Sequence, residues 1–161
     1  MSTICVFSDS HGYSENMLRA IEKENPDCVF FLGDGAADIA AVAKKHPQLT
    51  VHTVRGNCDT HSAAPIILRT TIEGKKFFAA HGHTFDVKTD ATFDELRSAA
   101  MEADAAVVLF GHTHVPFKDR SWGMEILNPG PIGSNTAVPS YGIVRIENGT
   151  ICTELKTLNK S

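Results

Sequence analysis

The sequence predicts a mixed α/β domain with a large share of β-structure, and three observations lead to this fold class. The first third of the chain alternates apolar strand patterns with amphipathic helix patterns, as parallel strands joined by helices do. The remainder consists mainly of short strand patterns separated by turns. The 161 residues are 42% hydrophobic and contain no Pro/Ser/Gly-rich linker, internal repeat or low-complexity block. We therefore expect one domain over residues 1–161.

The first third of the chain has a predicted β-α-β-α-β order. Three apolar segments are the predicted parallel strands: 3–7 (TICVF), 28–32 (CVFFL) and 51–55 (VHTVR). The helix between the first two is predicted to begin at a Ser14 cap. The helix between the second and third is predicted to end before Pro47, because proline cannot continue a helix.

The pattern changes after Ala64, where an antiparallel hairpin is predicted first. Residues 66–72 (IILRTTI) and 75–80 (KKFFAA) flank a short turn, as in a hairpin. A helix follows, and its sequence TFDE matches a capping box that would pair Thr92 with Glu95. The remaining strand patterns are 106–110 (AVVLF), a short segment near Phe117, 124–127 (MEIL), and the pair 141–146 and 150–155 around the turn Asn148-Gly149.

Charge and composition exclude several classes of function. The formal net charge is −4 and no block of five or more like charges occurs, which argues against extended nucleic acid and acidic membranes as partners. The N-terminal apolar run is broken at Ser8 and Asp9 and lacks a basic region before it, so it does not resemble a signal peptide. The four cysteines form no CxxC pair, which fits a reducing compartment. We expect a cytoplasmic protein that acts away from membranes.

Side chains that bind metal ions follow the predicted strands. The strands lead into SDSH (8–11), GD (33–34), GNCD (56–59), HGH (81–83) and GHTH (111–114). Loops beyond the carboxyl ends of strands in open α/β sheets meet in one crevice, so we expect these five loops to converge. Nitrogen and oxygen donors without a thiolate pair favour Mn, Fe, Co, Ni, Zn or Mg over a structural zinc-thiolate site. Seven or more donors exceed the needs of one ion and predict two neighbouring ions.

The order D-x-H, GD, GN-x-D, H and GH-x-H resembles the calcineurin-like metallophosphoesterases, in particular their small single-domain bacterial and archaeal phosphodiesterases. The resemblance spans nearly the full length. It implies a four-layer αββα sandwich of two mixed β-sheets flanked by helices. It also implies a phosphoric ester hydrolase that acts on small phosphodiesters with two divalent metal ions, manganese first among Mn, Ni, Zn, Fe, Co and Mg. In such enzymes a hydroxide that bridges the two ions attacks phosphorus.

The resemblance also assigns roles to individual residues. Seven positions match metal ligands of the family: Asp9, His11, Asp34, Asn57, His81, His112 and His114. The first ion would be held by Asp9, His11 and His114, and the second by Asn57, His81 and His112. Asp34 would bridge both ions, because a carboxylate has two oxygens. Asp34, Asn57, His81 and His112 are the expected catalytic residues.

Two residues beside these ligands are expected on the substrate side of the site. Cys58 stands where many relatives carry a histidine that protonates the leaving group, and its presence favours phosphodiesters or activated aryl esters over alkyl monoesters. A small residue packed beneath Asn57, with an inert thiol, is our first structural interpretation of Cys58. Three roles are open for His83: a position near the metal pair, a contact with substrate, or support of its own loop. Asp59 is expected to brace the Asn57 loop through hydrogen bonds.

The other histidines and the loop over residues 128–135 are assigned no substrate contact. His46, His52 and His61 are interpreted as helix-end, strand and surface-loop residues. Relatives often show NPGS followed by a basic residue near the substrate, whereas this chain has Pro131 and Asn135.

Two other functions remain open from the sequence: a non-catalytic protein-interaction scaffold of the same fold, and a nuclease. The intact set of ligands argues against the first function, and the acidic balance argues against the second. Exposed edge strands are expected to permit a homodimer or homotetramer.

Overall fold

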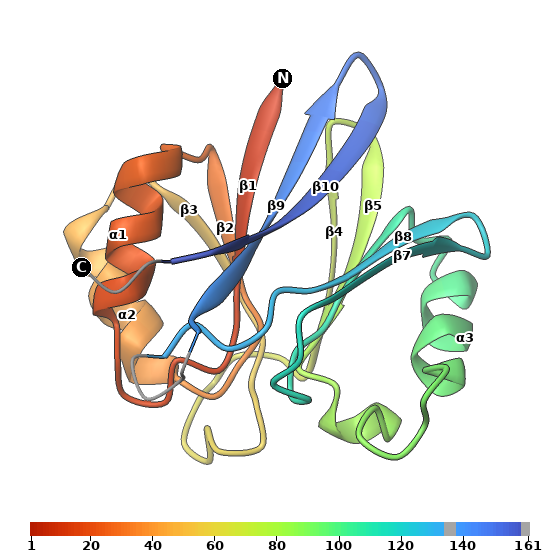
Figure 1. Ribbon diagram of the computed structural model, residues 1–161, viewed down its shortest axis with the longest axis horizontal. Helices are drawn as coiled ribbons and strands as arrows, with labels where there is room; N and C mark the ends of the chain where they lie inside the picture. The colour runs from red at the N-terminus through yellow and green to blue at the C-terminus, as the bar shows by residue number, and fades with distance from the viewer. Residues whose placement is uncertain (134–137, 159–161) are drawn as a thin grey trace.

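Two five-stranded sheets lie face to face in the computed structural model, which describes residues 1–133 and 138–158. The first sheet has the order β10-β9-β1-β2-β3, and the second has the order β4-β5-β6-β8-β7. Helices α1 and α2 cover the outer face of the first sheet, and α3 covers the outer face of the second (Figure 1). The αββα order of layers that the resemblance implies is confirmed.

The bounds of the elements agree with most of the predicted segments. The first sheet contains β1 (Ser2–Phe7), β2 (Cys28–Phe31), β3 (Thr50–Thr53), β9 (Ser140–Glu147) and β10 (Thr150–Thr157). The second contains β4 (Ile67–Ile72), β5 (Lys75–Ala80), β6 (Val107–Leu109), β7 (Phe117–Ser121) and β8 (Met124–Asn128). The helices are α1 (Glu15–Glu24), α2 (Ala36–Lys45), α3 (Asp94–Glu102) and the short 3₁₀ helix η1 (His83–Phe85).

The pairing of the strands follows the predicted directions. Strands β1, β2 and β3 are parallel neighbours, with Val6 beside Phe30 and Phe30 beside His52. Strands β4 and β5 form the predicted antiparallel hairpin. Asn148 and Gly149 connect β9 to β10 with φ angles of 52° and 75°, the positive values that a tight type I′ hairpin turn requires.

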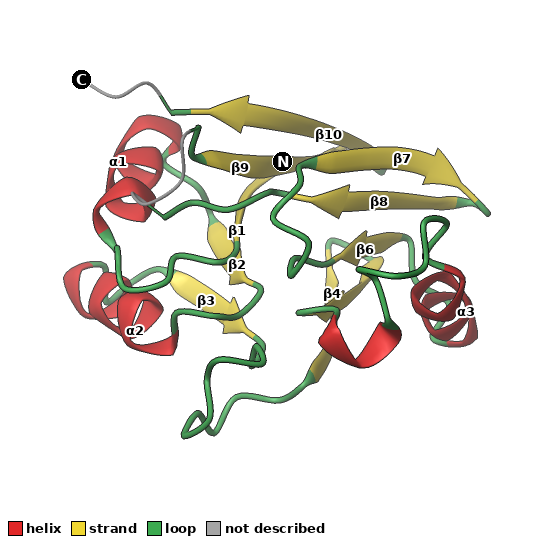
Figure 2. Cartoon of the chain, turned by 60° about the horizontal axis from the view of Figure 1, so that its bottom comes forward, coloured by secondary structure: helices red, strands yellow, loops and turns green. Residues whose placement is uncertain are grey.

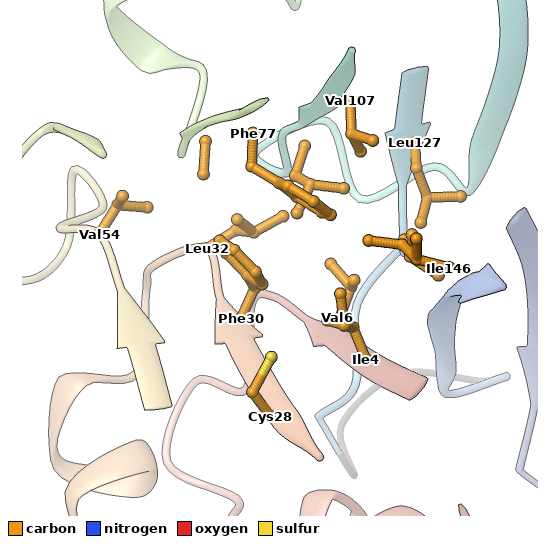
Figure 3. Packing of buried hydrophobic residues seen from close by; sticks show 13 residues of the cluster. Ile4, Val6, Cys28, Phe30, Leu32, Val54, Phe77, Val107, Leu127 and Ile146 are labelled. Atoms are coloured by element: carbon orange, nitrogen blue, oxygen red, sulfur yellow. The ribbon is translucent and has the colours of Figure 1, made fainter. Parts of the chain in front are cut away.

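A buried apolar cluster fills the space between the two sheets. It combines residues of β1 and β2 with residues of β5, β6 and β8, as Figure 3 shows. Phe30 of β2 stacks on Phe77 of β5 with a centroid distance of 5.3 Å and an interplanar angle of 13°. Two further clusters pack α1 and α2 on the first sheet and α3 on the second. The two inner faces of the sheets thus form the central core.

The starts of two helices differ from the prediction. Ser14 precedes α1, but its side chain makes no capping hydrogen bond. The capping box of Thr92 and Glu95 is wrong, because Phe93 precedes α3 in a left-handed conformation (φ 56°). The Asp90 carboxylate takes over this function and accepts hydrogen bonds from the backbone N–H groups of Thr92 (3.2 Å) and Asp94 (2.7 Å). These hydrogen bonds lower the pKa of Asp90.

The loops that carry the polar motifs leave the two sheets at the same end. This end lies at the bottom of Figure 1 and comes forward in Figure 2. The carboxyl ends of β1, β2 and β3 lie there beside those of β5 and β6. Among the helices of the described residues, none is both long and apolar enough to span a membrane.

The inter-sheet stack provides a test of what stabilises the fold. We expect Phe77→Ala to lower the free energy of unfolding by about 3–5 kcal/mol, since it removes a ring from a closely packed core. Urea denaturation followed by circular dichroism measures this loss. Met101→Ala is the control. Met101 is 53% exposed on α3, so its substitution should lower the free energy of unfolding little. Equal midpoints for the two variants would show that the sheets do not depend on this packing.

Candidate metal centre

The first cluster of ligand atoms forms around the Asp9 carboxylate, directly after β1. Its Oδ2 accepts hydrogen bonds from Ser8 Oγ (2.6 Å) and from the backbone N–H of His112 (3.2 Å). Its Oδ1 lies 3.1 Å from His114 Nε2 and 3.5 Å from His11 Nε2. Ligand atoms of Asp9, His11 and His114 all lie within 4.8 Å of one another. One oxygen is thus fixed by the protein, and the other faces these two imidazoles and lies 3.9 Å from His81 Nε2.

The Asp34 carboxylate lies between this cluster and a second one. Its Oδ1 accepts a hydrogen bond from the backbone N–H of Cys58 at 2.8 Å. Its Oδ2 lies 3.2 Å from His81 Nε2 and 3.9 Å from His11 Nε2. Asp34 therefore has an oxygen within reach of both groups of histidines.

The second cluster consists of Asp34, His81 and His112, again with ligand atoms within 4.8 Å of one another. His81 is fully buried, and its Nδ1 donates a hydrogen bond to the Leu32 carbonyl at 2.6 Å. This bond sets the ring so that Nε2 faces Asp34, an arrangement common for histidines that bind metals. His112 Nδ1 lies 3.2 Å from His81 Nε2.

The donor set and its spacing fit divalent cations. Metal–nitrogen and metal–oxygen bonds of about 2.1 Å place neighbouring ligands roughly 3.0–3.4 Å apart. The closest separations of 3.1 Å in the first cluster and 3.2 Å in the second fall in this range. Carboxylate and imidazole donors suit Mn, Fe, Co, Ni and Zn. Each cluster is therefore a candidate site for one divalent cation.

The pKa shifts of Asp34 and His112 favour the forms that bind metal ions, whereas the shift of His81 favours its protonated form while no ion is bound. Burial alone would raise the pKa of Asp34, but its hydrogen bonds with His81 and the Cys58 N–H outweigh burial and hold the pKa well below its usual range. Burial and the neighbouring His81 lower the pKa of His112 to about 4. Burial works against the charged form of His81 too, yet Asp34 and Asp9 raise its pKa above the usual value. Asp34 is thus ionised, and the imidazole of His112 is neutral, at pH 7.

Five of the ligand residues adopt a left-handed backbone conformation. Their φ angles are 56° at Asp9, 45° at His11, 63° at Asp34, 70° at His112 and 61° at His114. Asp and His are among the non-glycine residues that enter this region most often, but it still costs roughly 1–2 kcal/mol per residue. Such strain concentrates at functional sites, where surrounding structure holds it in place.

Glycines let the loops after β2 and β3 approach closely. A Cβ atom on Gly56 would collide with Asp34, at 2.5 Å from its backbone nitrogen. A Cβ atom on Gly33 would lie 2.6 Å from the Gly56 nitrogen and 2.9 Å from His81 Nδ1. The glycines of the GD and GN motifs are therefore required by contact between the two loops.

The Asp59 carboxylate ties these loops together. Its Oδ2 accepts hydrogen bonds from the N–H groups of Asp34 (2.7 Å) and Gly56 (2.9 Å). Its Oδ1 accepts from Gly35 (2.9 Å) and Ala36 (3.1 Å), which begin α2. Asp59 braces the Asn57 loop as expected, and it also positions Asp34 and caps a helix from a different loop.

The predicted residues outside the two clusters lie at the edge of the site. Asn57 is exposed, and its Nδ2 lies 3.6 Å from Cys58 Sγ. Packing of Cys58 beneath Asn57 is wrong: the side chain is exposed, and Sγ joins ligand atoms of His11 and Asp34 in a third group within 4.8 Å. The close approach of Gly56 to Asp34 fixes the path of the loop, and Cys58 follows it on the exposed side. Burial and the Asp34 charge raise the pKa of Cys58.

His83 lies at the start of η1, beside the second cluster. Its ring centroid is 5.5 Å from that of His81 and 6.2 Å from that of His112. Its Nδ1 is buried and has no hydrogen-bond partner among the described residues. His83 thus offers a free nitrogen close to the histidines of the second cluster.

Two residues that support the site were missed in the sequence. Ser8 holds Asp9, and Asn128 holds the GHTH loop, with Nδ2 donating to the Gly111 carbonyl (3.2 Å) and to Thr113 Oγ1 (2.9 Å). Asn128 ends the apolar strand β8, so its position at a strand end was the available signal. Asn135 of the same loop lies outside the described residues.

The hydrogen bonds of Asp59 predict a role in metal affinity without direct ligation. We expect Asp59→Ala to weaken divalent-cation binding by about 10–100-fold, because residues that orient ligands typically contribute that much. Asp59→Asn, which keeps one acceptor oxygen, should fall between this variant and the native protein. Isothermal titration calorimetry with Mn²⁺ measures the affinity, and exposed Glu102→Ala on α3 is the control. Native affinity in a folded Asp59→Ala protein would contradict this role.

Comparison with known proteins agrees with this geometry. Residues 2–149 match the profile of the calcineurin-like phosphoesterase superfamily domain. The chain is 28% identical over 148 residues to "Probable metallophosphoesterase YsnB" of Bacillus subtilis, covering 90% of this chain and 85% of the relative. It is 25% identical over 162 residues to a phosphodiesterase of Methanocaldococcus jannaschii, covering 89% and 93%.

Solved structures show the same fold. A conserved uncharacterized protein of Streptococcus pneumoniae, described as a predicted phosphoesterase, superposes with a TM-score of 0.81 at 30% identity, covering 97% of this chain and 89% of that one. Wild-type Vps29 of Entamoeba histolytica in complex with Zn²⁺ has a TM-score of 0.73 at 20% identity, covering 98% and 99%, a likeness of fold alone. With nearly the whole chain matched, the protein belongs to the calcineurin-like phosphoesterase superfamily.

Proposed function

We propose that this protein is a phosphodiesterase that uses two divalent metal ions, manganese first, to hydrolyse small phosphodiesters. The observation that carries the proposal is the place of Asp34, whose Oδ2 lies within 3.9 Å of His11 Nε2 and 3.2 Å of His81 Nε2. Asp9, His11 and His114 would hold the first ion. Asn57, His81 and His112 would hold the second, and Asp34 would serve both.

The roles of the protein groups follow from this arrangement. When bound, two cations neutralise the phosphate charge and convert water to a hydroxide nucleophile. The hydrogen bonds to one oxygen of Asp9 and one of Asp34 hold both carboxylates before any ion or substrate arrives, so little reorganisation is needed. The half-buried His83 ring beside the second cluster would contact a substrate oxygen, and the exposed Cys58 would lie where the ester group enters.

A non-catalytic interaction scaffold is the second candidate function. The likeness of fold to Vps29, a vacuolar protein sorting protein, favours it. The complete set of seven ligand positions favours the enzyme instead. A nuclease is disfavoured by the net charge of −4, since DNA binding relies on Lys and Arg contacts to phosphates.

Metal analysis combined with an assay tests the proposed function. We expect the Mn²⁺-loaded protein to hold two equivalents of metal and to hydrolyse bis(p-nitrophenyl) phosphate. His112→Ala and His114→Ala should each retain one equivalent, at different positions, and lose most activity. Mass spectrometry of bound metal and anomalous diffraction measure this, with His46→Ala as the control. Loss of the same ion from both variants would refute the assignment, and a fully loaded protein without turnover would favour the scaffold.

The identity of residue 58 predicts the choice between esters. We expect Cys58→His to increase kcat/KM for alkyl phosphate monoesters by about 10²-fold relative to diesters, because a general acid helps poor leaving groups most. Kinetics on ethyl phosphate and bis(p-nitrophenyl) phosphate measure the ratio, and Cys58→Ser is the matched control. If Cys58→His is slower on both esters while its metal content is unchanged, residue 58 does not govern ester preference.

A further inference from the structure

A cavity opens beside the first ligand cluster, between the loops after β1 and β3 and the start of α2. Its volume is about 450 Å³, and His11, Asp34 and Cys58 lie in its wall. The rest of the wall includes the small residues Gly12, Gly35, Ala36 and Ala37. We propose that this cavity receives one ester substituent of the phosphodiester and selects an uncharged alcohol group of aryl or nucleoside size. The inference rests on the proposed phosphodiesterase function and names the substrate class.

Three backbone donors at the start of α2 and in the loop after β1 are already engaged by carboxylates of the protein. The N–H of Gly12 donates to Asp38 Oδ2 at 2.8 Å. The N–H groups of Gly35 and Ala36 donate to Asp59 Oδ1 at 2.9 and 3.1 Å. The start of a helix normally attracts a phosphate or carboxylate. At α2 the Asp59 carboxylate already occupies that position, so an anionic substituent finds no free donor among these groups.

The charges in the wall also disfavour an anion. Asp34, Asp38 and Asp59 contribute three carboxylates, and no Lys or Arg is among the described residues that line the cavity. The four positive charges of two divalent cations in the proposed centre would be balanced by Asp9, Asp34, the phosphodiester and the hydroxide nucleophile, without Asp38 or Asp59. Asp38 and Asp59 then leave the outer part of the cavity negative. A carboxylate or second phosphate on the substituent would be repelled at close range, where screening by water is weak.

The size and the surface of the cavity favour a flat or compact organic group. Pockets for small ligands typically enclose roughly 300–1,000 Å³, and the volume here falls in that range. The small side chains of glycine and alanine and the exposed Cys58 leave space in the cavity for such a group. His61 also lines the cavity. His61, expected in a surface loop, is exposed and borders this cavity.

A matched pair of symmetric diesters tests the inference. Bis(4-carbamoylphenyl) phosphate and bis(4-carboxyphenyl) phosphate have the same shape, and either ester group of each presents the same charge to the cavity. We expect the Mn²⁺-loaded native protein to prefer the uncharged diester by about tenfold or more in kcat/KM, the scale of discrimination that a repelled charge provides. Chromatography of the released phenols measures both reactions.

Variants at the mouth of the cavity show whether the cavity causes this preference. Ala37 is exposed, lies in the wall and belongs to the first turn of α2. Ala37→Lys should reduce the preference by about tenfold, and Ala37→Glu should increase it. Ala41→Lys adds the same charge to the same helix outside the cavity and should leave the ratio unchanged. Circular dichroism confirms that the variants are folded.

The outcomes separate this inference from the function on which it rests. The inference is overturned, and the proposed phosphodiesterase function stands, if both diesters are hydrolysed with equal efficiency. The same holds if Ala37→Lys and Ala41→Lys change the ratio of kcat/KM values equally. No turnover of these diesters or of bis(p-nitrophenyl) phosphate by metal-loaded protein would overturn both.

Discussion

The apolar packing of the two sheets against each other is the contact on which the candidate metal centre depends. The first sheet supplies Asp9, His11, Asp34 and Asn57 from the ends of its strands, and the second sheet supplies His81, His112 and His114. Each sheet alone carries only part of the predicted ligand set, four residues on the first and three on the second. The core between the sheets, with Phe30 stacked on Phe77, holds the two halves at a distance where one carboxylate reaches histidines of both.

Hydrogen bonds between the loops of the two sheets then fix this arrangement. The His81 ring donates to the Leu32 carbonyl of the other half, and the His112 N–H donates to Asp9 Oδ2. Asp59 holds the loops after β2 and β3 through four backbone N–H groups. These bonds give the ligands fixed orientations. They also hold residues in left-handed conformations that an isolated loop would leave, which is the usual relation between a rigid scaffold and a strained site.

Asp59 also links the metal centre to the cavity beside it. Its carboxylate places Asp34, and the same carboxylate occupies the start of α2, where an anion would otherwise bind. One side chain thus contributes to the geometry of the centre and to the charge of the neighbouring wall. A substitution at this position would change both properties together, whereas Ala37 affects the wall alone.

The amino-acid sequence by itself determined the strand and helix order, because apolar periodicity reports burial directly, and it located the polar motifs at strand ends. Two local predictions failed for different reasons. At α3 another local contact, the cap by Asp90, replaced the Thr92 capping box, and at Cys58 the contact of Gly56 with the distant Asp34 fixed a loop that leaves the thiol exposed. The resemblance had already assigned the histidines to two groups around Asp9 and Asp34, and the ligand atoms cluster in the same groups. Only the tertiary structure decided which donors Asp59 and Asp38 occupy, and that a cavity opens beside them. These features join residues far apart in the chain, and their geometry is set by the packing of the two sheets, which no local pattern encodes.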